Sequence, residues 1–251
     1  MRISSLSFRL GLAFFVAAFS AGAQDLTELQ QRNRLKVLSY NIRNGKGMDE
    51  RADYQRTARA IRKYGADVVA VQEVDSATQR SNGRYVLGEI AREALMFPTF
   101  GAAMPYDGGK YGVGVLSRER PLSVRNVALP GREEPRTLLV LEFDRYVLGC
   151  THLSLNEEDR LASLALIRNE AARADKPFVL AGDWNDTIGS RLLKDIRTDF
   201  QMAGNLKTAT YPADKPQERI DFVALYQPTA GAMLPYGAWG PEEKAAPGHR
   251  P

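Results

Sequence analysis

The chain has 251 residues, of which 44% are hydrophobic and 25% are charged, and its formal net charge is +4. These proportions exclude a disordered, collagen-like or disulfide-scaffold protein, and the length does not require more than one domain. The single cysteine, Cys150, rules out both an internal disulfide and a zinc site made of several cysteine thiolates.

The N-terminus has the pattern of a secretory signal peptide. Arg2 and Arg9 form a basic start, residues 10–19 are an apolar run, and Ala21-Gly22-Ala23 supplies the small residues of a cleavage site. The apolar run is too short to span a bilayer, so we expect cleavage after Ala23 and no stable membrane span afterwards. The expected product is a secreted or periplasmic protein, organised as a signal peptide (1–23), a lead-in (24–34) and one domain (35–251).

Short apolar strands alternate with amphipathic helices along the domain. In chain order, the pattern predicts a strand at 36–41, a helix that begins near Tyr54 and ends at Gly65, a strand at 67–73, and a helix at 85–95 that Pro98 closes. Strands are predicted next at 113–117, 122–127, 137–143 and 146–152. The last predicted elements are a long helix at 157–174 capped by Asn156, and strands at 178–183 and 219–225. Two β-rich halves with intervening helices predict two packed sheets with helices outside.

Polar side chains end or closely follow four of the apolar strands, and another lies inside a fifth. A buried polar group there lowers stability unless it is paired or coordinated. Each has an ordinary explanation alone, as a salt-bridged strand end, a satisfied core histidine or a turn cap. Capping of turns explains less well why such residues occur at the ends of successive strands. The set consists of Asn41, Glu73, His152, the pair Asp183 and Asn185, and Asp221.

The residue types in this set favour hydrolysis assisted by a hard cation. Carboxylate and amide oxygens suit magnesium, manganese or calcium rather than a soft metal. The sequence has no phosphate-binding P-loop, no Gly-x-Ser-x-Gly nucleophile turn and no His-Glu-x-x-His helix. Activated water is therefore the leading nucleophile, and phosphate esters are the natural substrates because a divalent cation neutralises charge on the phosphoryl oxygens.

The same stretches resemble the endonuclease/exonuclease/phosphatase superfamily of metal-dependent phosphoesterases. The matching segments occur in the family's order and are residues 38–43, 67–74, 114–117, 151–153, 181–185 and 219–222. The resemblance implies an α/β (α+β) fold, a four-layered α/β/β/α sandwich of two packed mixed sheets flanked by helices. It also implies a site at one edge of the two sheets and Mg²⁺ or Mn²⁺ as the cofactor.

The resemblance assigns roles at the metal and at the attacking water. Glu73 corresponds to the principal metal ligand, and Asn41 lies beside it to help place the metal and the phosphate. Asp183 corresponds to the group that orients or deprotonates the water. Asn185 corresponds to a residue that holds the phosphate or a second metal.

Further roles concern the developing charge and the substrate. By resemblance, His152 donates to a phosphoryl oxygen, and Asp221 orients the family's last histidine, which is His249 here. A carboxylate beside an imidazole fixes its tautomer and raises its basicity. Tyr111 and Arg136 are expected to contact substrate, with a packed strand residue and a structural salt bridge as the respective alternatives.

The C-terminal sequence departs from the family pattern. Where the family has Ser-Asp-His and then an apolar strand, this sequence has Pro247-Gly248-His249-Arg250-Pro251. Gly248 replaces an acid that helps the metal site, and the closing strand is missing. Reduced activity, a shortened version of a longer parent, and compensation by another acid all remain open.

Four functions are compatible with these observations. The leading one is a monomeric extracytoplasmic phosphodiesterase or phosphomonoesterase acting on a small or lipid-derived phosphate. The second is a secreted nuclease for DNA or RNA, whose basic groove would use Lys46, Arg51, Arg80 and Arg84. The third is a non-catalytic binding protein on a decayed enzyme fold. The fourth is an unrelated α/β domain whose polar strand ends are caps.

Overall fold

The computed structural model describes residues 34–227. The helices and strands in this range all belong to the compact unit that begins at Val37. The predicted signal peptide and His249 lie outside the described residues. Within the described part, no helix has both the length and the apolar character needed to cross a membrane.

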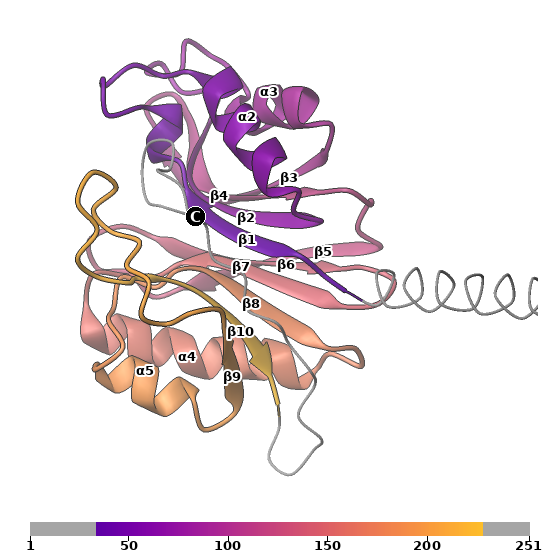
Figure 1. The fold of residues 1–251 in the computed structure, drawn as a ribbon, viewed down its shortest axis with the longest axis vertical. Coiled ribbons are helices and arrows are strands. Elements are labelled where there is room, and N and C mark those ends of the chain that lie inside the picture. Colours follow the sequence, from indigo (N-terminus) through magenta and orange to yellow (C-terminus); the bar gives the residue numbers. More distant parts are fainter. Residues whose placement is uncertain (1–33, 228–251) are drawn as a thin grey trace, which may run out of the picture. The chain divides into compact units, whose positions relative to one another are not determined.

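Within residues 34–227 the strands form two sheets. The first has the order β1-β2-β4-β3, made of β1 (Val37–Asn41), β2 (Val68–Ser76), β4 (Gly109–Ser117) and β3 (Phe97–Tyr106). β1 and β2 are parallel, and the other two pairs are antiparallel. Helices α2 (Tyr54–Tyr64) and α3 (Val86–Ala94) cover its outer face (Figure 1).

The second sheet has the order β5-β6-β7-β8-β10-β9. Its strands are β5 (Ser123–Leu129), β6 (Arg136–Glu142), β7 (Val147–His152), β8 (Phe178–Asp183), β10 (Asp221–Tyr226) and β9 (Phe200–Ala203). Only β7 and β8 are parallel neighbours in it. Helices α4 (Glu157–Ala172) and α5 (Arg191–Ile196) lie against its outer face (Figure 1).

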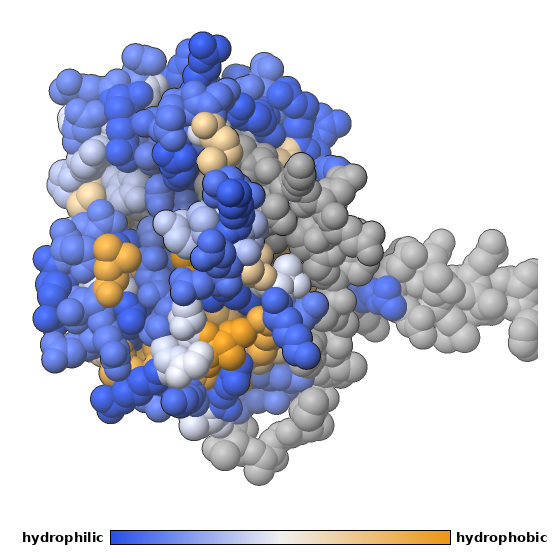
Figure 2. All heavy atoms as spheres, turned by 60° about the vertical axis from the view of Figure 1, so that its left-hand side comes forward, coloured by the Kyte–Doolittle hydropathy of each residue, from blue (hydrophilic) through white to orange (hydrophobic). Residues whose placement is uncertain are grey.

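The two sheets pack face to face and form the two inner layers. β1 contacts β8 and β10, β2 contacts β7 and β8, and β3 contacts β6. One apolar core lies between each sheet and its helices, the first centred on residues such as Ile61, Val71 and Ile90, the second on Leu164, Leu180 and Trp184. The predicted four-layered α/β/β/α sandwich is confirmed, and the surface seen in Figure 2 is mostly hydrophilic.

Local sequence signals explain where the main helices begin and end. The Asp53 side chain accepts a hydrogen bond from the Arg56 amide at the start of α2, and Gly65 ends this helix with a left-handed φ of 59°. Asn156 caps α4 by accepting from the amides of Glu158 and Asp159. These boundaries agree with the predicted ones.

Several elements differ from the predictions. The sequence pattern does not predict β3, because Pro98 indicates a helix stop, whereas this proline lies in the edge strand of the first sheet, where a missing N–H is tolerated. The pattern does not predict the short elements α5 and β9 either. β2 continues past Glu73 to Ser76, so Glu73 is not at a strand end, and Asp221 is the first residue of β10 rather than an internal one.

Candidate active site

The fold brings most of the predicted polar residues to one edge of the packed sheets. β1 and β2 run parallel in one sheet, and β7 and β8 run parallel in the other, so their carboxyl ends lie together in pairs. His152 is paired in register with Asp183, and Asp221 of the antiparallel β10 is paired with Asp183 from the other side. Because β1 contacts β8 and β10, Asn41 at the end of β1 meets this cluster.

The Asn41 side chain joins the two sheets. It is completely buried, and its Nδ2 lies 2.8 Å from Glu73 Oε1 and 3.1 Å from Asp183 Oδ2. Its Oδ1 accepts a hydrogen bond from the Arg43 amide at 3.1 Å. One neutral amide therefore holds two carboxylates from different sheets close together. Such a pair of carboxylates attracts a cation, since a nearby positive charge stabilises both ionised forms.

Glu73 lies at an irregularity of β2. The register to β4 shifts between Val71 and Val74, which is a β-bulge, and Glu73 itself has φ +56°. A left-handed conformation costs a residue with a Cβ about 1 kcal/mol, and bulges redirect side chains near functional sites. The bulge turns Glu73 toward Asn41, so a local backbone distortion rather than a strand end places this carboxylate.

Asp183 has partners on both of its carboxylate oxygens. Its Oδ1 accepts from the Asn185 amide at 3.0 Å, and its Oδ2, besides accepting from Asn41, lies 3.6 Å from His152 Nε2. Asp183 is 1% exposed and His152 is 8% exposed. The imidazole and the carboxylate thus form a preorganised pair at the ends of neighbouring strands.

Asn185 ties the two parallel strand ends together. Its backbone is left-handed, with φ +48°, and its Nδ2 donates to the Leu153 carbonyl at 2.8 Å. The amide nitrogen therefore has a structural role in joining the segment after β8 to the segment after β7. Asp221 is 3% exposed, and its predicted partner, His249, lies outside the described residues.

Tyr111 and Arg136 meet His152 in one small pocket. Glu134 also lines this pocket, which opens between β4 and the start of β6. Arg136 is 6% exposed, and its guanidinium pairs with Glu133 at 2.9 Å and with Glu134 at 3.0 Å. Burial, with smaller contributions from Glu73 and Glu134, raises the pKa of Tyr111, so its hydroxyl is a neutral donor.

Glu133 and Glu134 are site residues that no motif in the sequence indicates. Burial raises the pKa of Glu134 above its usual range. Burial also acts to raise the pKa of Glu133, but hydrogen bonds from the Leu155 amide, the Ser154 hydroxyl and Arg136 outweigh it and lower this pKa to about 2. The Glu133-Glu134 dipeptide is a visible signal in the sequence, but only the fold brings it to His152.

The donor set fits a magnesium-type ion that retains water ligands. Among residues 34–227, no group of three or more His, Cys, Asp or Glu side chains is arranged to hold a metal. The two carboxylates Glu73 and Asp183 do converge on the N–H groups of Asn41, so the carboxylate oxygens are the groups available to a cation. Magnesium is commonly bound by one or two carboxylates plus water and substrate phosphate, so this arrangement is sufficient for it. A closed structural zinc site is not compatible with these ligands.

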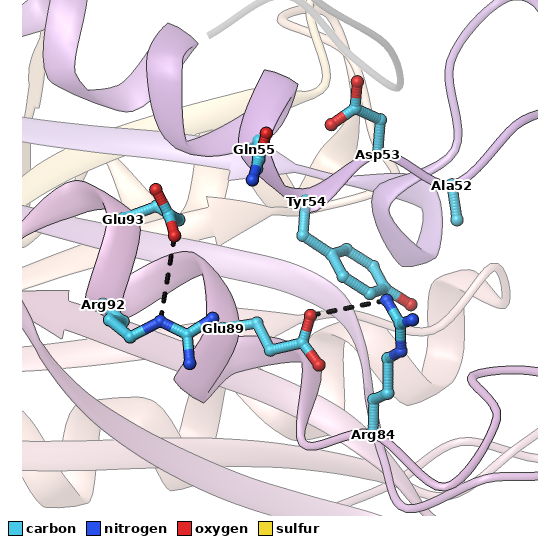
Figure 3. A pocket seen from close by; sticks show the side chains of 8 residues that line it. All are labelled: Ala52, Asp53, Tyr54, Gln55, Arg84, Glu89, Arg92 and Glu93. Atoms are coloured by element: carbon cyan, nitrogen blue, oxygen red, sulfur yellow. Dashed lines mark ion pairs between the residues drawn. The ribbon is translucent and has the colours of Figure 1, made fainter.

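A larger pocket lies away from these residues. It is lined by residues of α2, α3 and the segments before them (Figure 3). Arg84 faces Glu89 at 3.6 Å and Arg92 faces Glu93 at 3.8 Å, so its charged groups are paired (Figure 3). None of the predicted site residues lines it, and we assign the chemistry to the edge of the sheets, where the predicted residues converge.

Comparisons with known proteins agree with the fold and the family resemblance. A model of the Endonuclease/Exonuclease/phosphatase family matches residues 38–243, and the chain belongs to this family. The family generally comprises hydrolases of phosphoester bonds that use divalent metal ions. A search of curated proteins found no match.

Solved structures share the fold at low sequence identity. An endonuclease/exonuclease/phosphatase from Beutenbergia cavernae is 21% identical with a TM-score of 0.60, and the match covers 76% of this chain but only 64% of that one. A mannosyl-6-phosphatase from Bacteroides thetaiotaomicron is 15% identical with a TM-score of 0.60, covering 77% and 85%. The human Nocturnin catalytic domain is 16% identical with a TM-score of 0.55, covering 76% and 82%.

Proposed function

We propose that this protein is an extracytoplasmic, magnesium- or manganese-dependent phosphoesterase that hydrolyses a small or lipid-derived phosphodiester or phosphomonoester. The observation that carries the proposal is the convergence of Glu73 and Asp183 on the Asn41 amide, at 2.8 and 3.1 Å, with His152 beside Asp183. A purely structural role does not require two carboxylates from different sheets on one buried donor.

The proposed reaction is attack of water on phosphorus, in which a new P–O bond forms as the ester P–O bond breaks, and the alcohol leaves after its oxygen takes a proton from solvent. Glu73 would hold the divalent cation, with the Asn41 side chain donating to its carboxylate, and the cation would neutralise charge on the phosphoryl oxygens. Asp183 orients the attacking water and accepts its proton. The His152 imidazole donates to a phosphoryl oxygen and stabilises the charge that builds up in the transition state. Tyr111, which lines the pocket next to His152, contacts the substrate, whereas the buried pairing of Arg136 with Glu133 and Glu134 supports the structural salt bridge for that residue.

The pairing of nearby cations favours a compact substrate over a long polyanion. Arg80 pairs with Asp75 at 2.7 Å and Arg84 with Glu89 at 3.6 Å. Arg43 and Arg56 pair with Glu50 and Asp49. A nuclease groove needs several cations available to phosphates, because backbone contacts dominate nucleic-acid affinity. Two of the four cations that supported the nuclease hypothesis, Arg80 and Arg84, are therefore partly neutralised by acids.

The proposed location outside the cytoplasm is based on the signal-peptide pattern of residues 1–23. It predicts that protein recovered from the periplasm or the medium begins at Gln24. Mass spectrometry of the exported protein measures this directly, and an uncleaved N-terminus contradicts it.

The substrate class is tested with purified protein that starts at Gln24. Bis-p-nitrophenyl phosphate, p-nitrophenyl phosphate and supercoiled plasmid are assayed in parallel with Mg²⁺, Mn²⁺ or EDTA. We expect EDTA-sensitive hydrolysis of a small ester and little plasmid nicking. Efficient nicking would instead identify a nuclease. Metal binding without hydrolysis of any of the three would favour the decayed-enzyme hypothesis.

A further inference from the structure

Arg80 lies at the centre of a polar cross-link next to the candidate metal centre. Its Nε and Nη2 donate to both carboxylate oxygens of Asp75, at 2.7 and 2.8 Å. Nη2 also donates to Asn44 Oδ1 at 3.0 Å, and Nη1 donates to the Tyr106 hydroxyl at 3.1 Å. The guanidinium carbon lies 4.4 Å from the centre of the Tyr106 ring and 5.5 Å from that of Tyr111. A single side chain thus connects β2, β3, β4 and the turn after β1.

The segment that carries Arg80 is itself held in place. The Arg80 amide donates to Asp107 Oδ2 at 2.7 Å, and the Gln79 amide donates to the Asp107 carbonyl at 2.8 Å. The Ser81 hydroxyl donates to the Thr78 carbonyl at 3.0 Å. The guanidinium is therefore presented from an ordered turn, which is what a cross-link requires.

The cross-link reaches residues close in sequence to Glu73 and Asn41 of the candidate metal centre. Asp75 lies two positions after Glu73 on β2, beyond the bulge where the pairing with β4 is interrupted. Asn44 lies in η1 (Arg43–Gly45), the turn that follows Asn41, and has a left-handed φ of 57°. The bulge removes the regular backbone pairing of β2 with β4 at Glu73. The position of Glu73 therefore depends on the contacts that fix the part of β2 after the bulge, which includes Asp75.

Arg80 is not suited to be a phosphate-binding cation. Asp75 is 1% exposed and neutralises the guanidinium with a bidentate pair. A guanidinium has five N–H groups, and hydrogen bonds to Asp75, Asn44 and Tyr106 use four of them. The positive charge of Arg80 and four of its N–H donors are therefore used by contacts within the protein and are not available to a phosphate.

We infer that Arg80 is a positioning residue of the metal centre, which ties Asp75 to Asn44 and so fixes Glu73 and Asn41 relative to each other. The inference rests on the proposed metal-dependent function. Arg80 contacts residues next to Glu73 and Asn41 rather than these residues themselves, so its effect is expected at the lower end of the about 10- to 100-fold range for partners that orient metal ligands.

The test is Mn²⁺ binding, measured by electron paramagnetic resonance of the free ion during titration. We expect the Arg80→Lys variant to bind Mn²⁺ about tenfold more weakly than wild type, because Lys keeps the charge but cannot make the bidentate and branched contacts. Arg84→Lys is the matched control, since Arg84 ends the same turn and its ion pair within residues 34–227 is the longer one to Glu89, at 3.6 Å. We expect its Mn²⁺ affinity to equal that of wild type.

Asn44→Gly provides a second variant in case Arg80→Lys does not fold. Glycine suits the left-handed backbone there and removes only the acceptor for Arg80. We expect an Mn²⁺ affinity about threefold weaker, the effect of one hydrogen bond.

The outcomes separate the two proposals. Wild-type affinity in Arg80→Lys, or in a folded Asn44→Gly, would overturn the positioning role alone. A raised KM with unchanged Mn²⁺ affinity in Arg80→Lys would also overturn it, by making Arg80 a substrate contact. Absence of Mn²⁺ binding by wild type would overturn the metal-dependent function and the inference with it.

Discussion

Replacing Arg160 with methionine tests how the segments after β7 and β8 are held together. Arg160 of α4 is 8% exposed, and its Nε donates to Asp186 Oδ2 at 2.9 Å. Its Nη1 donates to the carbonyls of Ser154 and Leu155 at 3.1 and 2.7 Å. Asp186 directly follows the segment 183–185, and Ser154 lies two residues after His152. The Arg160 guanidinium therefore holds the segment after β7 and the segment after β8 together.

The expected loss in the free energy of unfolding is at the lower end of the range for a buried ion pair that loses one partner. Removing one partner of such a pair costs about 3–5 kcal/mol, because it leaves an uncompensated buried charge. Asp186 is 9% exposed, and its Oδ1 keeps the Thr187 amide as a donor at 2.9 Å. We therefore expect a loss of about 3 kcal/mol, and a urea midpoint lower by about 1 M for a slope near 3 kcal/mol/M.

The assay is equilibrium urea unfolding followed by circular dichroism, with Arg191→Met as the control. Arg191 faces Asp195 at 3.8 Å on the surface of α5, and its loss is expected to leave the midpoint almost unchanged. Adding Asp186→Asn to Arg160→Met removes the stranded charge and is expected to recover at least about 1 kcal/mol. A loss below about 1 kcal/mol for Arg160→Met, or a double variant less stable than it, would refute this reasoning.

Three further predictions concern the site itself. His152→Ala is expected to lower kcat by about 100-fold while changing KM little, since its donor acts on transition-state charge, and steady-state kinetics with unchanged kcat would remove it from the mechanism. Asn41→Asp replaces the shared donor with a third acid, so we expect a lower melting temperature without metal and a larger Mg²⁺-induced rise than in wild type; equal rises in both would argue against a metal here. Glu133→Gln is expected to destabilise the protein near neutral pH. Because the folded-state pKa of Glu133 is lowered from 4.5 to about 2, this difference should be full above pH 4.5 and disappear as the pH falls toward 2, which urea unfolding at several pH values measures.

Local signals made much of the fold predictable. Gly65 and Asn156 mark helix ends through backbone conformation and capping, which depend on a few neighbouring residues. Strands such as Phe178–Asp183 are short apolar runs that end in a polar residue. The parallel pairing of β7 with β8, which places His152 beside Asp183, is a finding of the structure.

Other features depend on contacts between distant residues and were not predictable from local pattern. Pro98 predicted a helix stop, and its place in an edge strand follows from pairing with β4. The bulge at Glu73 has no glycine to indicate it. The contacts of Arg80 with Asn44 and of Glu133 with Ser154 join segments 36 and 21 residues apart, and no sequence periodicity predicts them.

The most direct test of the metal-dependent phosphoesterase compares wild type with Glu73→Gln in the hydrolysis of bis-p-nitrophenyl phosphate, with Mg²⁺ and with EDTA. Glutamine keeps the size and one oxygen acceptor but removes the charge that binds the cation. We expect EDTA to abolish wild-type turnover, and Glu73→Gln to lose at least about 100-fold in kcat/KM while remaining folded by circular dichroism. Turnover that persists in EDTA, or a Glu73→Gln variant as active as wild type, would contradict the assignment of this cluster as the metal-dependent centre.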